Sequence, residues 1–496
     1  MFIDAVDILF LGALVLPLIN QIGTRIGLKK LREALAVLVL IVSMYLVYPL
    51  YLSVQSGIQI LPLPFTPLGS CFEIDMLSVF MAAVFIFIGL MSAIFSVRYM
   101  EHDTGLTEYY TALILMVAGM VGVAFAGDFF TFFIFWELMC ISSYVLVAFR
   151  KERWEPVEAG FKYLIMSSAG SALLLLAMSL LYGMTGTLNF AGLTYAMRSA
   201  PQSSNPWLLV TLALIISGFG VKAAMVPYHT WLPDAHPAAP SPVSSMLSGV
   251  MIKTGVYGLV RVLILVFTPV EALWQLALLV LAVLTMFTGN LMALVQTDLK
   301  RLLAFSSIAQ IGYILFGFSL GTLEGLTGSL LHVLNHAVMK GLLFMCAGAF
   351  LHASGTRNLV DLKGIGRKMP VSGAVFTVAC LAIAGLPALN GFISELYIIL
   401  AGVQAVMYLP TALMVVNIII SVAYYLRIIQ VTMLGQPAEK LSGLREASVS
   451  MLTPMLILLS LCFIIGLYPG PFIALAKESA QAALDATAYL KPFLRV

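Results

Sequence analysis

The sequence predicts an all-α integral membrane protein with about 14 transmembrane helices. Of its 496 residues, 61% are hydrophobic and 10% are charged, and the mean hydropathy is +1.03. In soluble domains, about a quarter of the residues are charged. Apolar runs of about 20 residues, the length that crosses a bilayer as a helix, recur along nearly the whole chain. A membrane barrel would instead show short alternating strands.

Hydropathy places the predicted spans with boundaries good to a few residues. The first span has acidic residues near its start and lacks a small-residue cleavage motif, so we expect it to stay in the protein rather than to be a signal peptide. In chain order, the spans are expected near 4–22, 34–54, 76–98, 107–127, 129–149, 160–183, 207–227, 241–265, 271–296, 302–320, 326–351, 371–400, 408–434 and 450–470.

Basic residues test the topology, because they concentrate in cytoplasmic loops. They gather on every second predicted loop or its flanks, as Arg25, Lys29, Lys30, Arg32, Arg98, Arg150, Lys151, Arg153, Lys162, Lys300, Arg301, Arg357, Lys363, Arg367, Lys368, Lys440 and Arg445. The opposite side carries Arg198, Arg261, Lys477, Lys491 and Arg495. This distribution predicts an inner (plasma) membrane protein with both termini on the non-cytoplasmic side.

Two predicted spans are expected to be broken helices. One contains Pro227 and is followed by Pro233, and the other holds Gly385, Pro387 and Gly391 in mid-span. Proline removes a backbone donor and clashes with the preceding turn, so neither span can be a continuous helix.

The two breaks suggest how the chain is organised. Each break has the same ordinal place in a five-span block, and blocks with an odd number of spans alternate in direction. We therefore expect inverted repeats at 107–265 and 271–434, preceded by helices 1–3 in 1–106 and followed by the last helix and a tail in 435–496. The alternative is that two kinks coincide by chance.

Five ionisable residues fall well inside predicted spans. A charge at the centre of a membrane helix costs at least about 2.5 to 3.5 kcal/mol on insertion scales, so these side chains should face a polar interior. They are Glu137, Lys222, Lys253, Lys340 and Glu395.

Three polar residues share one helix face. His332, His336 and Lys340 are spaced i, i+4, i+8, which puts them on a single stripe. Histidine titrates near neutrality and a desolvated lysine loses its charge readily, so the stripe favours a proton relay. The alternatives are structural polar packing and a metal pair, and the metal pair lacks the acid of H-E-x-x-H and a third ligand.

Glu137 and Lys222 have opposite signs and lie on different helices of one block. When paired, each lowers the other's cost of burial, and their separation favours a neutral lysine that releases its proton. The pair is therefore predicted to be a switch. The alternative is a static salt bridge.

Other polar residues and the cysteines are less specific. His229, Asp234 and His236 follow the first break, where they could line an access route or cap helix ends. The five cysteines contain no C-x-x-C pair, and the chain has neither a P-loop nor a dinucleotide fingerprint. No metal or cofactor is therefore expected in this chain.

Long motifs resemble the antiporter-like subunits of respiratory complex I, a family shared with membrane-bound hydrogenases, F(420)H(2) dehydrogenases and Mrp cation/proton antiporters. The segments that carry the resemblance are FFIFWELM around Glu137, GFGVKAAMVPYHTWLPDAHPAAPSPVSSMLSGVMIKTGVYG from Gly218, DLKRLLAFSSIAQIGY from Asp298, LLHVLNHAVMKGLLF around His336 and GLPALNGFISE ending at Glu395. The resemblance covers the chain from about Phe72 to Arg427.

The resemblance implies fourteen spans, two inverted five-helix repeats and broken seventh and twelfth helices. Carried over position by position, the residues implied in ion translocation are Glu137, Lys222, Lys253, His332, His336 and Glu395. Glutamate at the last position leans toward the chain 4 (M-type) subunit, with N-type as the other choice. The short tail after the last span argues against the L-type subunit, which has a long lateral helix.

The function implied is a proton- or sodium-translocating subunit with no redox centre of its own, in a respiratory oxidoreductase. Its partners would be paralogous antiporter-like subunits, small membrane subunits and the lipid bilayer, without nucleic acid. Iron–sulfur clusters and a flavin or nickel–iron site would belong to partner subunits. The alternatives are a subunit of an Mrp-type Na+/H+ antiporter without redox chemistry and an independent solute carrier.

Overall fold

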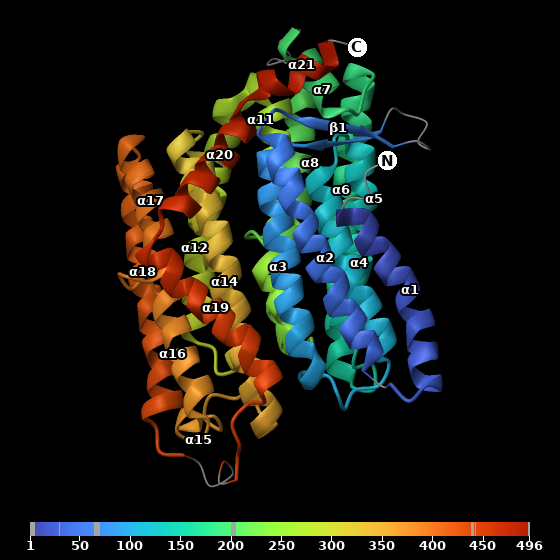
Figure 1. The fold of residues 1–496 in the computed structure, drawn as a ribbon. Coiled ribbons are helices and arrows are strands. Elements are labelled where there is room, and N and C mark those ends of the chain that lie inside the picture. Colours follow the sequence, from blue (N-terminus) through green and yellow to red (C-terminus); the bar gives the residue numbers. More distant parts are fainter. Residues whose placement is uncertain are drawn as a thin grey trace.

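A computed structural model describes residues 5–28, 30–63, 70–199, 205–437, 441 and 443–494 as a long helical bundle (Figure 1). Within these residues, thirteen helices are long and apolar enough to cross a membrane. The remaining predicted span, near 371–400, is divided between two shorter helices. The all-α membrane fold is thereby confirmed. Lys29, Lys440 and Arg495 lie outside the described residues.

The helices follow the predicted spans closely. The first three are α1 (Ala5–Arg25), α2 (Leu31–Val54) and α3 (Met76–Tyr99). The next group is α4 (Leu106–Phe125), α5 (Phe129–Val147), α6 (Trp154–Thr185), α8 (Pro206–Ala223), α9 (Leu232–Ala238), α10 (Ser241–Met246), π-helix η1 (Leu247–Met251) and α11 (Ile252–Val266). The last group is α12 (Glu271–Leu294), α13 (Leu299–Ser319), α14 (Leu323–Ser354), α16 (Pro370–Ile383), α17 (Asn390–Gln404), α18 (Tyr408–Ile429) and α19 (Val449–Leu467).

Several short elements do not appear in the hydropathy pattern. A hairpin of β1 (Gln59–Pro62) and β2 (Cys71–Ile74) joins α2 to α3 at the upper end of Figure 1. The other short helices are α7 (Phe190–Ser199), the 3-10 helix η2 (Thr268–Val270), α15 (Ile365–Lys368), the π-helix η3 (Gln430–Leu434), α20 (Gly470–Leu484) and α21 (Ala486–Leu494). Helix α20 crosses the bundle obliquely against α3 and α14. We call the end with the hairpin the hairpin side and the opposite end, with α15, the basic side.

Both predicted helix breaks are present. Helix α8 ends at Ala223, and the chain turns through Ala224 with φ of 54° before α9 begins. Helix α16 ends at Ile383, and Gly385 and Ala388 take φ of 78° and 74° before α17 begins. A left-handed backbone costs energy in a residue with a Cβ, so surrounding contacts must hold Ala224 and Ala388 in place.

The same local device occurs on opposite sides of the molecule. Asp128 caps the start of α5 and forms an isolated bridge with Asn189, which follows α6. Asp298 caps α13 and bridges in the same way to Asn358, which follows α14. Helices α6 and α14 each have 32 residues and end at a left-handed glycine. The two helix pairs thus share caps, lengths and stops, while the division into two inverted repeats stays a prediction.

The centre of the bundle is shielded from lipid. The apolar stretches of Ser241–Val266 and Leu299–Ser319 are entirely buried inside the protein, whereas those of Ala5–Arg25 and Leu31–Val54 are only 33% and 28% buried. Polar side chains on α11 and α13 therefore face protein, which provides the polar interior that the sequence requires.

Helices α12 and α13 approach each other through reciprocal glycines. A Cβ on Gly289 would lie 2.4 Å from the backbone nitrogen of Ala309, and one on Gly312 would lie 2.7 Å from that of Met286. These neighbours are backbone atoms, which cannot move as a flexible side chain can. The crossing therefore requires glycine at both positions.

We expect Gly289→Ala to force α12 and α13 apart and to lower the free energy of unfolding by about 1–3 kcal/mol. Gly183→Ala, on α6 with open space around its Cβ position, is the matched control and should be neutral or slightly stabilising. Thermal unfolding of the detergent-solubilised protein, followed by tryptophan fluorescence, measures both. Equal melting temperatures would contradict the close-packing argument.

Candidate functional site

Lys253 and His336 meet at the centre of the bundle, where α11 faces α14. The Lys253 Nζ atom lies 2.5 Å from His336 Nδ1 and 2.5 Å from the carbonyl oxygen of Ser248. Ser248 belongs to the π-helix η1, an irregularity that is often found at functional sites. All three residues are fully buried. The contact joins the two predicted five-span blocks.

Lys253, His336 and His332 form a row of buried polar side chains. In this row, His332 lies on α14 on the side of the second helix break. Its Nε2 lies 2.6 Å from Gln310 Oε1, and its Nδ1 lies 2.9 Å from Ser394 Oγ. Its ring centroid is 6.2 Å from that of His336. The predicted stripe is therefore connected to α17, which carries Ser394.

Glu395 follows Ser394 and lies at the break between α16 and α17. The side chain is buried, and its Oε1 has no hydrogen-bond partner. Gly385 lies against Glu395 Oε2, and its φ of 78° favours glycine at this position beside the carboxyl group. The row of Lys253, His336 and His332, together with the carboxyl group of Glu395, extends from the centre of the bundle to the second break.

Lys222 lies at the end of α8, directly before the first break. Its Nζ donates to the hydroxyl of Tyr163 at 2.8 Å and to Cys140 Sγ at 3.0 Å. It also lies 5.0 to 5.9 Å from the ring centroids of Tyr163, Tyr144 and Trp136. Such contacts stabilise a cation. This aromatic cage was not predicted, because aromatic residues in a membrane helix are most simply explained by packing.

Glu137 and Lys222 do not form the predicted ion pair. The ion pairs within 4.0 Å that the described residues form do not include it, because the Lys222 ammonium points to Tyr163 and Cys140 instead. Glu137 is only half-buried, and its Oε1 has no hydrogen-bond partner. The structure therefore shows these two groups apart.

Two further lysines are buried, Lys340 in the middle of α14 and Lys300 at the basic-side start of α13. Lys340 donates to the carbonyl oxygen of Leu303 at 2.9 Å and to the hydroxyl of Ser306. Lys300 donates to the carbonyl oxygen of Ala239 at 2.6 Å and is 0% exposed. The sequence placed Lys300 on a loop or its flank, and it does flank the loop before α13, but its burial was not predicted. Its position at the second residue of α13 turns the side chain into the protein.

The polar residues after the first break have different environments. His236 is fully buried and stacks on Phe344 with ring centroids 4.5 Å apart, and neither of its ring nitrogens has a hydrogen-bond partner. His229 is half-buried. Asp234 forms ion pairs with Lys162 at 3.4 Å and Arg301 at 2.9 Å near the surface. Only His236 thus reaches the interior.

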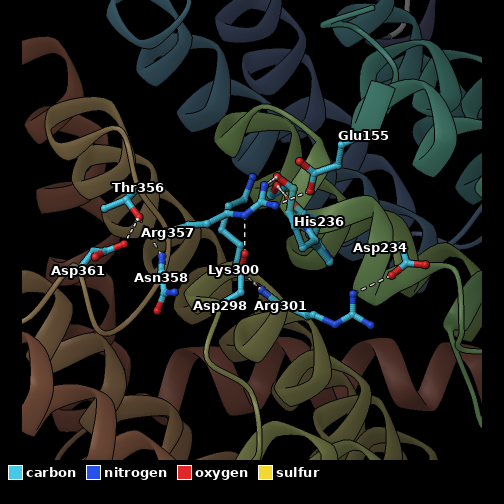
Figure 2. Close-up of polar contacts among 12 residues, drawn as sticks. Glu155, Asp234, His236, Asp298, Lys300, Arg301, Thr356, Arg357, Asn358 and Asp361 are labelled. Atoms are coloured by element: carbon cyan, nitrogen blue, oxygen red, sulfur yellow. Dashed lines mark hydrogen bonds and ion pairs between the residues drawn. The ribbon is translucent and has the colours of Figure 1, made fainter. Parts of the chain in front are cut away.

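A polar cavity of about 710 Å³, which we call the vestibule, opens on the basic side next to His236. Figure 2 shows Arg357 between Glu155 and Asp298, with which it forms ion pairs. Burial alone would lower the pKa of Arg357, but the charges of Asp298 and Glu155 raise it above its ordinary value. Arg357 also donates to the carbonyl oxygen of Pro237, the residue after His236, at 2.8 Å.

The described residues offer no cluster of three or more His, Cys, Asp or Glu side chains suited to a metal ion. The nitrogens of His332 are used by Gln310 and Ser394, and Nδ1 of His336 is used by Lys253. The arrangement is a row of proton-accepting and proton-donating groups.

Comparison with protein families matches residues 126–421 to the family described as NADH:quinone oxidoreductase/Mrp antiporter. Residues 67–110 match the N-terminus of chain 5 of NADH-ubiquinone oxidoreductase (complex I).

Three similar curated proteins are subunits of redox complexes. NADH-quinone oxidoreductase subunit N of Desulforudis audaxviator is 35% identical over 82% of this chain and 84% of its own length. F(420)H(2) dehydrogenase subunit N of Methanosarcina mazei is 32% identical over 84% of this chain and 86% of its own. Hydrogenase-4 component B of Escherichia coli is 33% identical over 82% of this chain and 63% of its own. The first two carry the N designation rather than the M designation toward which Glu395 leaned.

Solved structures show the same fold. A chain of the membrane-bound sulfane sulfur reductase, an archaeal respiratory membrane complex, has a TM-score of 0.89 and 30% identity over 98% of both chains. A chain of the Mrp complex from a Dietzia species has a TM-score of 0.89 and 26% identity over 99% of both. A chain of respiratory complex I from Thermus thermophilus, at 23% identity and a TM-score of 0.83 over 98% of this chain and 99% of its own, shares the fold.

We expect His336→Leu to leave the Lys253 ammonium short of a partner and to cost about 1–3 kcal/mol of stability. Adding Lys253→Met removes the orphaned charge, so the double variant should be more stable than the sum of the two single changes predicts, by about 0.5–3 kcal/mol. Thermal unfolding in detergent measures this coupling. The control pairs His336→Leu with Lys222→Met, which should be additive. Additivity in both pairs would refute the Lys253–His336 contact.

Proposed function

The chain belongs to the NADH:quinone oxidoreductase/Mrp antiporter family, and on that premise we propose that it is an antiporter-like, ion-translocating subunit of a multi-subunit respiratory oxidoreductase. The observation that carries the proposal is the buried row from Lys253 through His336 and His332 to Ser394, beside Glu395. A static core would not need titratable groups in sequence across the centre of a membrane bundle.

In this proposal protons enter from the vestibule on the basic side. The residue after the buried His236 is Pro237, which lines the vestibule, and His236 lies within the electrostatic field of Lys253, Lys300 and Lys340. A histidine without fixed partners can accept a proton from one side and release it to the other. His236 would therefore pass protons from the vestibule to Lys253.

From Lys253 the proton moves sideways along α14. Its contact with His336 Nδ1 supplies the acceptor, and His332 with its partners Gln310 and Ser394 continues the path to Glu395. Because Lys253 donates to a carbonyl oxygen rather than to a carboxylate, it can release its proton without breaking an ion pair. Glu395 would gate release at the second break.

Lys222 is the proposed switch, and Glu137 controls it. The half-buried Glu137 leaves part of its side chain reachable from outside this chain. A charge on a neighbouring subunit could thus draw Glu137 away from Lys222 or let it return. In the separated state the aromatic cage and Tyr163 hold Lys222 in place.

We further propose that the basic side is cytoplasmic, by the positive-inside rule, so that both termini lie on the other side. The segments 107–265 and 271–434 would be the two inverted repeats, supported by the paired caps of α5 and α13. The partners would be other membrane subunits of the complex, which would hold the iron–sulfur clusters and the flavin or nickel–iron site. The transported ion would be H+ or Na+.

A subunit of an Mrp-type Na+/H+ antiporter is the second candidate, favoured by the TM-score of 0.89 to a chain of the Mrp complex. The sequence relatives favour the redox complex instead. Iron and flavin content of the native complex, purified through a tag on this subunit, separates the two.

Lys222→Ala is expected to reduce ion pumping by at least about tenfold, because a positioned proton-transfer group contributes about 10²- to 10⁴-fold. Electron transfer coupled to pumping should fall with it. The measurement uses inverted membrane vesicles given NADH, reduced coenzyme F(420) or H2 in turn, with acridine-dye quenching for pumping. Lys477→Ala, an exposed lysine on α20, is the control. Wild-type pumping and electron transfer in Lys222→Ala would refute the proposal.

Glu137→Gln is expected to slow or uncouple the complex in the same vesicles, because it removes the charge that acts on Lys222. Glu137→Asp keeps the charge and should have a milder effect. The control is Glu478→Gln, which changes an exposed glutamate on α20. If the Asp and Gln variants are equally impaired, the charge of Glu137 is not what matters.

A further inference from the structure

Helix α11 carries a second polar stripe that leads away from the proposed path. Lys253, Tyr257 and Arg261 are spaced i, i+4, i+8, and all three are buried. With a rise of about 1.5 Å per residue, Arg261 lies about 12 Å from Lys253 along the helix, toward the hairpin side. The stripe therefore points from the proposed proton-carrying lysine to the membrane surface opposite the vestibule.

Arg261, at the hairpin-side end of this stripe, forms a bidentate (two-pronged) ion pair with Asp75. Its Nη1 lies 2.6 Å from Asp75 Oδ2, and its Nη2 lies 2.8 Å from Asp75 Oδ1. The Nη2 atom also donates to Ser78 Oγ at 3.0 Å, and Nε donates to the Tyr257 hydroxyl at 3.1 Å. The two charged side chains are 1% and 3% exposed.

The pair is fixed from several sides. Asp75 also caps α3 by accepting from the backbone nitrogen of Ser78 at 2.8 Å. The Tyr257 hydroxyl donates to the carbonyl oxygen of Ala124 on α4 at 2.7 Å. The guanidinium lies 5.3 Å from the ring centroid of Tyr257 and 5.2 Å from that of Tyr489 on α21. Arg261 is thus held at one position, with its Nε facing Tyr257.

The chemistry of this end differs from that of the second break. Arginine stays protonated in proteins, so Arg261 can neither take up nor release a proton. A fixed positive charge beside a narrow polar passage repels protons and cations. At the second break, the row instead ends near the buried carboxyl group of Glu395, which can take up and release a proton.

We propose that the Arg261–Asp75 pair is an electrostatic barrier that closes the α11 stripe, so that a proton on Lys253 can leave only sideways along α14. This inference rests on the proposed function. In this proposal, protons reach the first five-span block (107–265) only from the basic side. They are released through the second block (271–434). The competing reading is that the pair is a structural tie between α11 and the start of α3.

The test uses the native complex in proteoliposomes with a K+ diffusion potential, an internal pH dye and no electron donor. Arg261→Met should raise passive proton influx at least about tenfold, because the barrier charge is gone. Arg261→Lys loses the two-pronged contact, but the adjacent Asp75 carboxylate favours the charged form of a lysine at this position, so this variant should remain tight. Equal leaks in the two variants would show a structural tie and overturn the proposal, and so would a tight Arg261→Met variant.

Two further variants guard against misfolding. Arg261→Met leaves a buried carboxylate unpaired, which is destabilising, so Arg261→Met/Asp75→Asn removes both charges and should leak equally. Glu73→Gln is the matched control in the same buried cluster. Burial, opposed in part by the charge of Arg261, raises the pKa of Glu73 to about 8. This carboxyl group is therefore mostly neutral at pH 7, and replacing it with an amide changes the charge little. This control should stay tight, and a leak from it would overturn the proposal.

Lys253→Met distinguishes failure of the barrier from failure of the proposed function. Added to Arg261→Met, it should abolish the leak, and a leak that persists would bypass Lys253 and contradict the barrier. Alone, it should stop pumping. If it stops pumping while Arg261→Met stays tight, only the barrier is refuted. If it pumps normally, the proposed function itself is refuted.

Discussion

The interior of the bundle depends on hydrogen bonds from buried lysines to backbone carbonyl oxygens. Lys253 donates to Ser248, Lys300 to Ala239 and Lys340 to Leu303. A carbonyl dipole lowers the cost of placing an ammonium group in an apolar medium without adding a negative charge that would bind the proton permanently. The irregular backbone near two of these carbonyls, at the π-helix η1 and at the end of α9, supplies oxygens that a regular helix would use internally.

Arginines have the opposite role. Arg261 pairs with Asp75 on the hairpin side, whereas Arg150 pairs with Asp103 and Arg357 with Asp298 on the basic side. A guanidinium is planar, always charged and suited to a carboxylate, whereas a buried lysine changes its protonation readily. The arginine pairs thus lie at the two ends of the protein, whereas Lys253 and Lys340 lie in its centre and Lys300 is buried near the basic side. This division agrees with the proposal that the arginine pairs stay fixed while protons move along the central row.

Much of the fold and part of the site follow from sequence. Span lengths and the prolines and glycines of the two breaks have strong local signals, and the spacing of His332 and His336 defines a helix face. The hairpin and helices α7, α20 and α21 were missed because they are too short for a hydropathy window. Arg261 and Lys300 were missed as site residues because a charge near the end of a span has the same local sequence whether it faces water or protein. The open Glu137–Lys222 contact depends on side-chain direction, which spacing does not give.

The contact between Lys253 and His336 has a consequence for how the chain is made. Its two sides are 83 residues apart, on helices that a growing chain delivers to the membrane at different times. A polypeptide that has inserted α11 but not yet α14 holds a buried lysine without the ring nitrogen that receives its proton. In the proposed mechanism, the nascent first half therefore lacks the acceptor for the Lys253 proton, since the row is complete only when the two halves pack against each other.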